Sequence, residues 1–167
     1  MVINVNMFSY IFSENFSLKR ITSKIHFSNN KLMNNNIDKT KMFQEFENDI
    51  YPFRLVVGHI DDIDSLNQLY ESIDREELKP HKDAKATTYP AYDKSTNEAA
   101  VVVLFTFKPS IRTIAHESLH VTQMVMSNIC QTELNSYTEE CYSYLIGWVS
   151  EKLEQYENNM KKNANDM

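Results

Sequence analysis

The 167-residue sequence is poor in cysteine, glycine and proline, of which it has two, two and four copies. Because Cys130 and Cys141 could form one disulfide at most, the chain lacks the cysteine framework of small secreted domains and suits a reducing compartment. The longest uninterrupted apolar run, residues 99–105, has the length of a strand and is far too short to span a bilayer. We therefore expect no membrane partner.

Positive charge is also scarce. The 17 lysines and arginines are outnumbered by 23 aspartates and glutamates, which gives a net charge of −6 and a sequence pI near 5.4. A chain with this balance has no general attraction to nucleic acid. No basic region precedes the apolar residues within positions 8–12, so the start does not resemble a secretory signal peptide. We expect a cytoplasmic protein without a nucleic-acid partner.

The remaining composition suits one domain, because 42% of the residues are hydrophobic and the chain is long enough to bury a sizeable core. Residues 1–41 are rich in Asn, Ser and Lys and include the runs 29–30 and 34–36 of asparagine, which predicts a low-complexity, mobile segment. We expect residues 42–160 to form the single domain and residues 161–167 to form a polar tail.

From residue 51 onward the hydrophobic pattern indicates regular structure. Residues 53–60 read as a strand, and Leu66, Leu69, Tyr70 and Ile73 recur at helical spacing. Residues 85–92 predict an edge strand limited by Pro90, residues 93–97 a turn, and residues 99–107 a strand buried on both faces. Two helices follow. This order predicts an α+β fold with a small mixed or antiparallel sheet packed on those helices.

The first of the two helices carries an HExxH motif, formed by His116, Glu117 and His120. Ser110 is the expected N-cap, and no proline or glycine interrupts residues 111–127. On a helix the two histidines stack on one face and can hold one metal ion, while the carboxylate of Glu117 can reach a bound water as general base. The ordinary alternative is a helix with a solvated face that happens to carry these three residues.

A third ligand is expected on the second helix. Glu140 shares one stripe of that helix with Ser143, Tyr144 and Gly147, and a helix-interior glycine suits close packing against another helix. Ser136 and Glu139 fit a capping box, which gives Glu139 a local role. Glu140 is therefore the favoured ligand. Glu139 stays as an alternative ligand. Cys141 is a third possibility, although a packing role as a small apolar residue is favoured for it.

These residues resemble the gluzincin class of zinc metallopeptidases, in which a glutamate on the next helix completes the site of an HExxH motif. Residues 110–149 are also similar to small zincin-like proteins encoded by tailed bacteriophages, which implies the host cytoplasm as location. The resemblance implies a minimal zincin-like fold, one Zn²⁺ ion held by His116, His120 and Glu140, and Glu117 as the catalytic base. Tyr144 stands where many gluzincins have an aspartate, and it is a weaker partner for a zinc-bound histidine.

The predicted function is that of a zinc metallopeptidase whose partner is a peptide or protein substrate. An exposed edge at residues 85–92 could pair with an extended peptide through backbone hydrogen bonds, or these residues could simply close the sheet. The alternative function is that of a non-catalytic or degenerate zinc-binding protein that serves as a binding or assembly module. A His/His/Glu ligand set favours catalysis over a purely structural site, because it leaves a coordination position open to water.

Overall fold

The computed structural model describes residues 43–81 and 83–165, with side chains described through residue 162. Contacts within the chain divide it into residues 1–41 and 42–167, and all the described residues belong to the second unit. The segment expected to be mobile, residues 1–41, lies outside the described residues.

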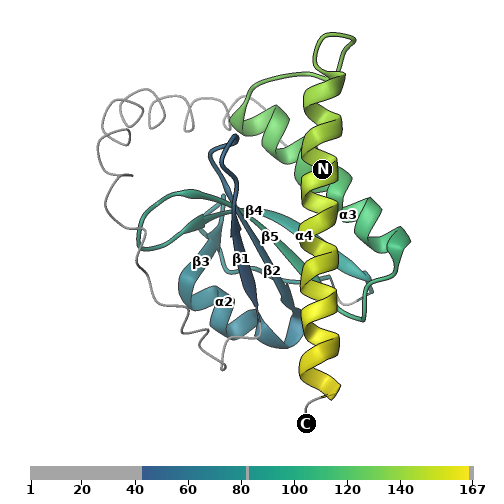
Figure 1. Cartoon of the computed structure of the whole chain (residues 1–167). Coiled ribbons are helices and arrows are strands. Elements are labelled where there is room, and N and C mark those ends of the chain that lie inside the picture. Colours follow the sequence, from purple (N-terminus) through teal and green to yellow (C-terminus); the bar gives the residue numbers. More distant parts are fainter. Residues whose placement is uncertain (1–42, 82, 166–167) are drawn as a thin grey trace, which may run out of the picture. The chain divides into compact units, whose positions relative to one another are not determined.

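A five-stranded mixed sheet forms the centre of the fold (Figure 1). Its strands are β1 (Gln44–Glu47), β2 (Arg54–His59), β3 (Tyr70–Ser72), β4 (Ala86–Asp93) and β5 (Ala99–Phe105), in the spatial order β1-β2-β5-β4-β3. The β2–β5 pair is parallel and the other neighbouring pairs are antiparallel. The helical elements are the 3₁₀-helix Ile60–Asp62, α2 (Ile63–Leu69), α3 (Ile111–Met124), the π-helix Val125–Ile129 and α4 (Glu139–Asn165). The predicted α+β class is confirmed.

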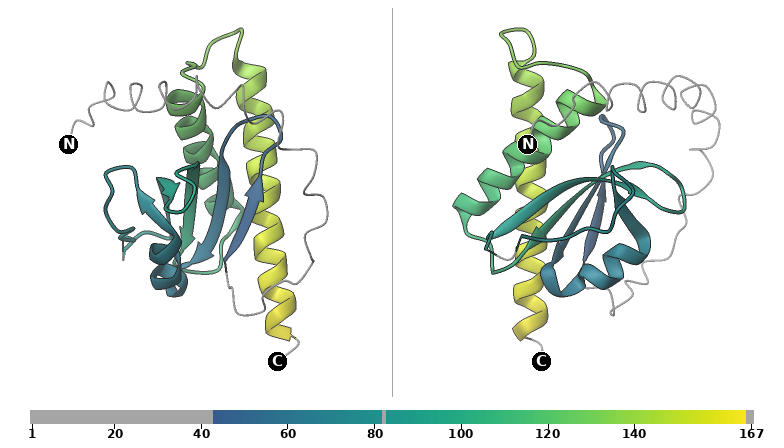
Figure 2. Two further views of the ribbon diagram at one scale, coloured as in Figure 1. Left: turned by 90° about the vertical axis from the view of Figure 1, so that its left-hand side faces the viewer. Right: turned by 180° about the vertical axis from the view of Figure 1, so that it is seen from behind.

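Helices cover both faces of the sheet, with α3 and α4 on one face and α2 on the other (Figures 1 and 2). Strand β5 joins the two cores because alternate side chains point to opposite faces. Val101, Val103 and Phe105 belong to the core under α3 and α4, and Val102 and Leu104 belong to the core under α2. The prediction that this strand is buried on both faces is confirmed.

Two strands differ from the sequence prediction. The helix expected through Ile73 ends at Leu69, because Tyr70 turns to an extended conformation and its strand β3 pairs with the end of β4. Tyr70 is buried in the sheet core, so tertiary packing overrides the helical spacing of its side chain. The sequence pattern does not predict strand β1. Its four residues alternate between half-buried and exposed, which leaves little hydrophobic signal.

Strand β4 confirms the predicted strand at residues 85–92 and supplies a partly open edge. It pairs with β5 from Ala86 to Tyr92, but β3 covers its other side only from Ala91 to Asp93. Among the described strands, none pairs with the outer side of residues 86–89. This open edge lies beside α3, as a hydrogen bond between Thr88 and Glu117 shows.

The long helix α4 is amphipathic, and its buried side chains belong to the core shared with α3. No helix in residues 43–165 combines the length and the apolar character that crossing a membrane would require.

Candidate metal centre and hydrolytic site

The HExxH motif lies on α3, as the sequence predicted. The helix begins after Ser110, whose hydroxyl accepts a hydrogen bond from the Thr113 backbone N–H at 3.2 Å. His116 is exposed and His120 is half-buried, and their rings meet edge to face with centroids 4.6 Å apart. The two Nε2 atoms are 3.1 Å apart. The helix therefore directs both imidazole nitrogens to one point on its surface.

This spacing fits two ligands of one zinc ion. Tetrahedral coordination with Zn–N bonds of about 2.05 Å places two ligand nitrogens about 3.3 Å apart. The observed 3.1 Å between the Nε2 atoms is close to that value. A pair of neutral imidazoles can also share one N–H···N hydrogen bond at this distance. The two histidines thus fit two coordination positions of one metal ion.

Glu117 lies next to the histidines but points toward the sheet, and its side chain is buried, with the residue 4% exposed. Its Oε2 accepts a hydrogen bond from the Thr88 hydroxyl of β4 at 2.7 Å. Within the described part of the chain, Thr88 is its only hydrogen-bonding partner, and no lysine or arginine pairs with it. A buried carboxylate with one neutral donor is costly to fold, which favours a functional role.

Thr88 is the site residue that the sequence prediction missed. The alternation of β4 places it on the same face as Ala86, which packs in the core beneath α3 and α4. That alternation could have been read from the sequence. The identity of its partner could not, because Glu117 is 29 residues away on another element.

Helix α4 packs against the opposite side of α3 from the histidines. The Ser118 hydroxyl accepts a hydrogen bond from the Ser150 hydroxyl of α4 at 2.9 Å and donates one to the Ile114 carbonyl at 2.8 Å. Successive helical residues are about 100° apart, so Ser118 lies about 200° around α3 from His116. The histidine face is therefore turned away from α4.

Glu140, the predicted third ligand, is not brought to the histidines. It is exposed in the first turn of α4, ten residues before Ser150 and hence about 15 Å along the helix. In the described residues, no group of three or more His, Cys, Asp or Glu side chains is placed to hold a metal ion. The structure thus brings His116 and His120 together, turns the neighbouring Glu117 toward the sheet, and leaves Glu140 apart from the histidines.

The stripe of Glu140 faces solvent, which corrects the expectation that it packs closely on α3. Ser143, Tyr144 and Gly147 are all exposed, and a Cβ atom on Gly147 would have no neighbour within 4 Å. The signal was present in the sequence, because the buried side chains of α4 recur at helical spacing on the far side. These side chains are Tyr142, Leu145, Val149, Leu153 and Tyr156. Glu140 is nine residues before Val149 and so about 180° from it around the helix.

The turn that leads into α4 carries a reciprocal hydrogen-bonded pair one residue earlier than the predicted capping box. The Asn135 side chain accepts from the Tyr137 N–H at 2.8 Å, and the Thr138 hydroxyl accepts from the Asn135 N–H at 2.9 Å. This reciprocal pair replaces the capping box expected between Ser136 and Glu139. Glu139 is exposed and, like Glu140, stands apart from the histidines. Cys130 and Cys141 are both free thiols, and Cys141 is exposed, where a buried packing role was expected.

Comparison of the chain with models of known protein families, with curated proteins and with solved structures finds no match.

Proposed function

We propose that this protein is a zinc-dependent hydrolase of peptide or related amide bonds, with His116 and His120 as metal ligands and Glu117 as general base. The observation that carries the proposal is the juxtaposition on α3 of converging imidazoles, 3.1 Å apart, and a buried carboxylate without a cationic partner among the described residues. A solvated helix face would explain the histidines. It would not explain why the glutamate between them is buried.

The chemistry divides between the metal and the carboxylate. A bound zinc ion supplies a Lewis acid that lowers the pKa of a coordinated water toward neutrality. Glu117 accepts a proton from the attacking water and returns it to the departing amine. The Thr88 hydroxyl holds Oε2 of Glu117, which leaves Oε1 for the water. Thr88 is thus a positioning residue for the base.

The open edge of β4 suits an extended peptide. Residues 86–89 have no strand on their outer side among the described strands, and Thr88 in this segment contacts Glu117. A peptide that adds to this edge would lie within reach of the base, held by backbone hydrogen bonds that carry little sequence preference. This placement supports a peptide or protein as substrate.

The third protein ligand remains a prediction from the sequence, with Glu140 favoured and Glu139 as the alternative. Either would require a different placement of the start of α4, because both lie apart from the histidines. This separation favours the second candidate function, a non-catalytic metal-binding or assembly module. The two functions differ in whether Glu117 affects turnover.

The experiment measures zinc per chain and hydrolysis of a mixed peptide library by the full chain and its variants. We expect one zinc per chain in the wild type, loss of zinc in His116→Ala and retention in His81→Ala, an exposed histidine away from the motif. Glu117→Gln should retain zinc and lose hydrolysis by about a hundredfold or more. Loss of zinc in Glu140→Ala or in Glu139→Ala would identify the third ligand.

Wild-type protein without zinc would refute the metal site. If the wild type retains zinc but hydrolyses no peptide, the catalytic role is refuted and the protein is identified as the binding module. If Glu117→Gln retains zinc and hydrolyses peptides as fast as the wild type, the catalytic role is also refuted.

A further inference from the structure

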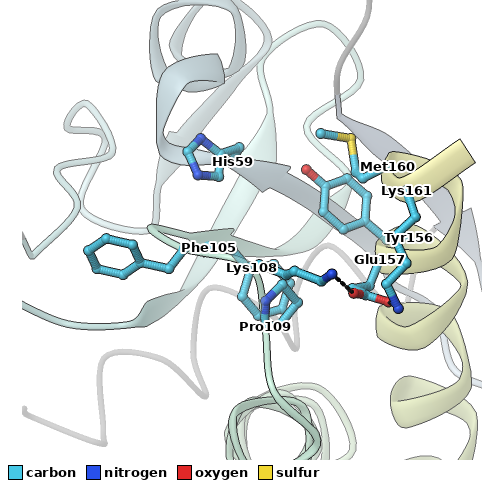
Figure 3. A pocket seen from close by; sticks show the side chains of 9 residues that line it. His59, Phe105, Lys108, Pro109, Tyr156, Glu157, Met160 and Lys161 are labelled. Atoms are coloured by element: carbon cyan, nitrogen blue, oxygen red, sulfur yellow. Dashed lines mark ion pairs between the residues drawn. The ribbon is translucent and has the colours of Figure 1, made fainter. Parts of the chain in front are cut away.

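The two ends of α4 carry different chemistry. Near its C-terminal end, a pocket of about 260 Å³ is lined by apolar side chains and by the ion pair of Lys108 and Glu157 (Figure 3). At the opposite end the turn after α3 enters the helix (Figure 1), and there the only two cysteines of the chain, Cys130 and Cys141, lie near Tyr51. Because thiols can be oxidised reversibly, this second end is a candidate for a further site.

Hydrogen bonding joins the two segments that carry the cysteines. Cys130 ends the π-helix, and the backbone turns at Gln131, whose φ of 52° lies in the left-handed region. The carbonyl of the next residue, Thr132, accepts a hydrogen bond from the Tyr142 hydroxyl at 2.8 Å. Residues just after each cysteine are thus bonded to each other across the turn.

Tyr51 lies beside both segments. It packs with Cys130 against the core under α3 and α4, and its hydroxyl donates to the Cys141 carbonyl at 3.4 Å. Phe53, two residues further on, meets the Trp148 ring of α4 with centroids 5.9 Å apart. Trp148 is seven residues after Cys141 and so shares its side of the helix. The segment that begins at Tyr51 therefore follows the side of α4 that carries Cys141.

The charges of the thiols and the phenol also act on one another. Burial raises the pKa of the Cys130 thiol, and the charge of Cys141 raises it further. Burial likewise raises the pKa of Tyr51, and the charges of Cys141 and Cys130 and a hydrogen bond with the Cys141 side chain raise it further. Because interactions between charges weaken with distance, the three groups form one cluster.

The two thiols differ in exposure. Cys141 is exposed and Cys130 is half-buried, so a disulfide in solution reaches Cys141 first. Most residues of the intervening turn, 131–138, are exposed. A turn with so little buried surface can adjust its backbone to bring two sulfur atoms to bonding distance.

We propose that Cys130 and Cys141 form a reversible disulfide by exchange with a low-molecular-weight disulfide such as oxidised glutathione. The Cys141 thiolate attacks one sulfur of oxidised glutathione, and the first glutathione leaves as a thiolate. The Cys130 thiolate then attacks the Cys141 sulfur of the mixed disulfide and displaces the second glutathione. Two protein thiols are oxidised, one glutathione disulfide is reduced to two thiols, and both protons pass from the cysteines to the departing glutathiones.

The first step favours the second. In the mixed disulfide Cys141 has no charge, so one of the two causes that raise the pKa of Cys130 is removed and more of that thiol ionises. The finished bridge fastens the end of the π-helix to the first turn of α4 and closes a ring of about twelve residues. The proposal does not rest on the hydrolytic function, because neither cysteine belongs to the candidate metal centre.

The test incubates the reduced full chain with oxidised glutathione, blocks free thiols with N-ethylmaleimide and analyses the intact chain and its peptides by mass spectrometry. We expect the wild type to lose both free thiols, retain no glutathione and stay a monomer with a bridge between Cys130 and Cys141. Cys130→Ser should keep one glutathione on Cys141, whereas Cys141→Ser should take up glutathione at least about tenfold more slowly. The Tm of the oxidised wild type should rise by about 5–10 °C and return on reduction with dithiothreitol.

A stable glutathione adduct on the wild type, a disulfide between two chains, or two free thiols after the incubation would each overturn the proposal. Equal rates of glutathione uptake by the two single variants would overturn the assigned order of attack. A lower Tm in the oxidised form would show that the bridge opposes the native fold, and would overturn the proposal as well.

Discussion

Thr88→Val tests the contact on which the proposed catalytic base depends. The Thr88 hydroxyl donates to Oε2 of the buried Glu117 side chain at 2.7 Å, an ordinary distance for an O–H···O hydrogen bond. Valine keeps the shape of threonine and leaves Oε2 of Glu117 without its partner. An orphaned buried charge of this kind costs about 2 kcal/mol, so we expect the unfolding free energy to fall by that amount and Tm to fall by about 6–8 °C. Urea and thermal unfolding of the full chain measure both quantities.

Thr122→Val is the matched control, because the Thr122 hydroxyl is buried on the same helix as Glu117 and has no partner among the described residues. Removing this hydroxyl should leave the unfolding free energy unchanged or raise it by up to about 1 kcal/mol. Glu117→Met completes the cycle: with the carboxylate gone, Thr88→Val should lose most of its effect, which gives a coupling energy of about 1–2 kcal/mol. If Thr88→Val is no more destabilising than Thr122→Val, or is equally destabilising with and without Glu117→Met, the argument for this contact fails.

Three further predictions concern stability away from the motif. Gly147→Ala should raise the unfolding free energy by about 1 kcal/mol in urea titrations, because the position is helical and open to solvent. Tyr156→Phe should raise the unfolding free energy by about 1 kcal/mol, because it removes a buried hydroxyl that has no partner among the described residues. Burial raises the pKa of Asp93, but hydrogen bonds from Ser95 and the charge of Arg54 outweigh it and hold the pKa below its usual value. A lowered folded-state pKa adds stability above the unfolded-state pKa that is lost as pH falls, so Asp93→Asn should flatten the loss of Tm below about pH 4. An unchanged acid slope, or a destabilising Gly147→Ala or Tyr156→Phe, would contradict the respective prediction.

The parts of the fold that the sequence predicts are those fixed by local chemistry. The β-branched run in β5 is buried on both faces, and Ser110 caps α3 as its place before the apolar repeat indicates. The parts that it does not predict depend on partners distant in sequence. Tyr70 fits a helical pattern as well as a strand, and the pairing of β3 with the end of β4 decides between them. Local spacing cannot carry that information.

The candidate site likewise has a part that local sequence predicts and a part that depends on distant partners. His116 and His120 converge because i and i+4 share one face of any helix, so the motif alone predicts their geometry. The identity of the third ligand depends on which face of α4 turns inward. Successive residues of a helix point about 100° apart, so neighbouring glutamates face different directions. The reciprocal pair before α4 joins Asn135 and Thr138, one residue earlier than the predicted pair of Ser136 and Glu139, so Thr138 has the role that the sequence predicts for Glu139.

The orientation of α4 also sets what a zinc site with Glu140 would require. Tyr142 is buried and donates to the Thr132 carbonyl at 2.8 Å, and it lies about 200° around the helix from Glu140. The first turn of α4 cannot direct Glu140 to the histidines and keep Tyr142 in the core. Zinc binding through Glu140 must therefore expose Tyr142, which an ultraviolet difference spectrum on zinc addition can detect. If zinc binds, Glu140→Ala weakens it and Tyr142 stays buried, Glu140 acts on the metal through its charge and is not a ligand.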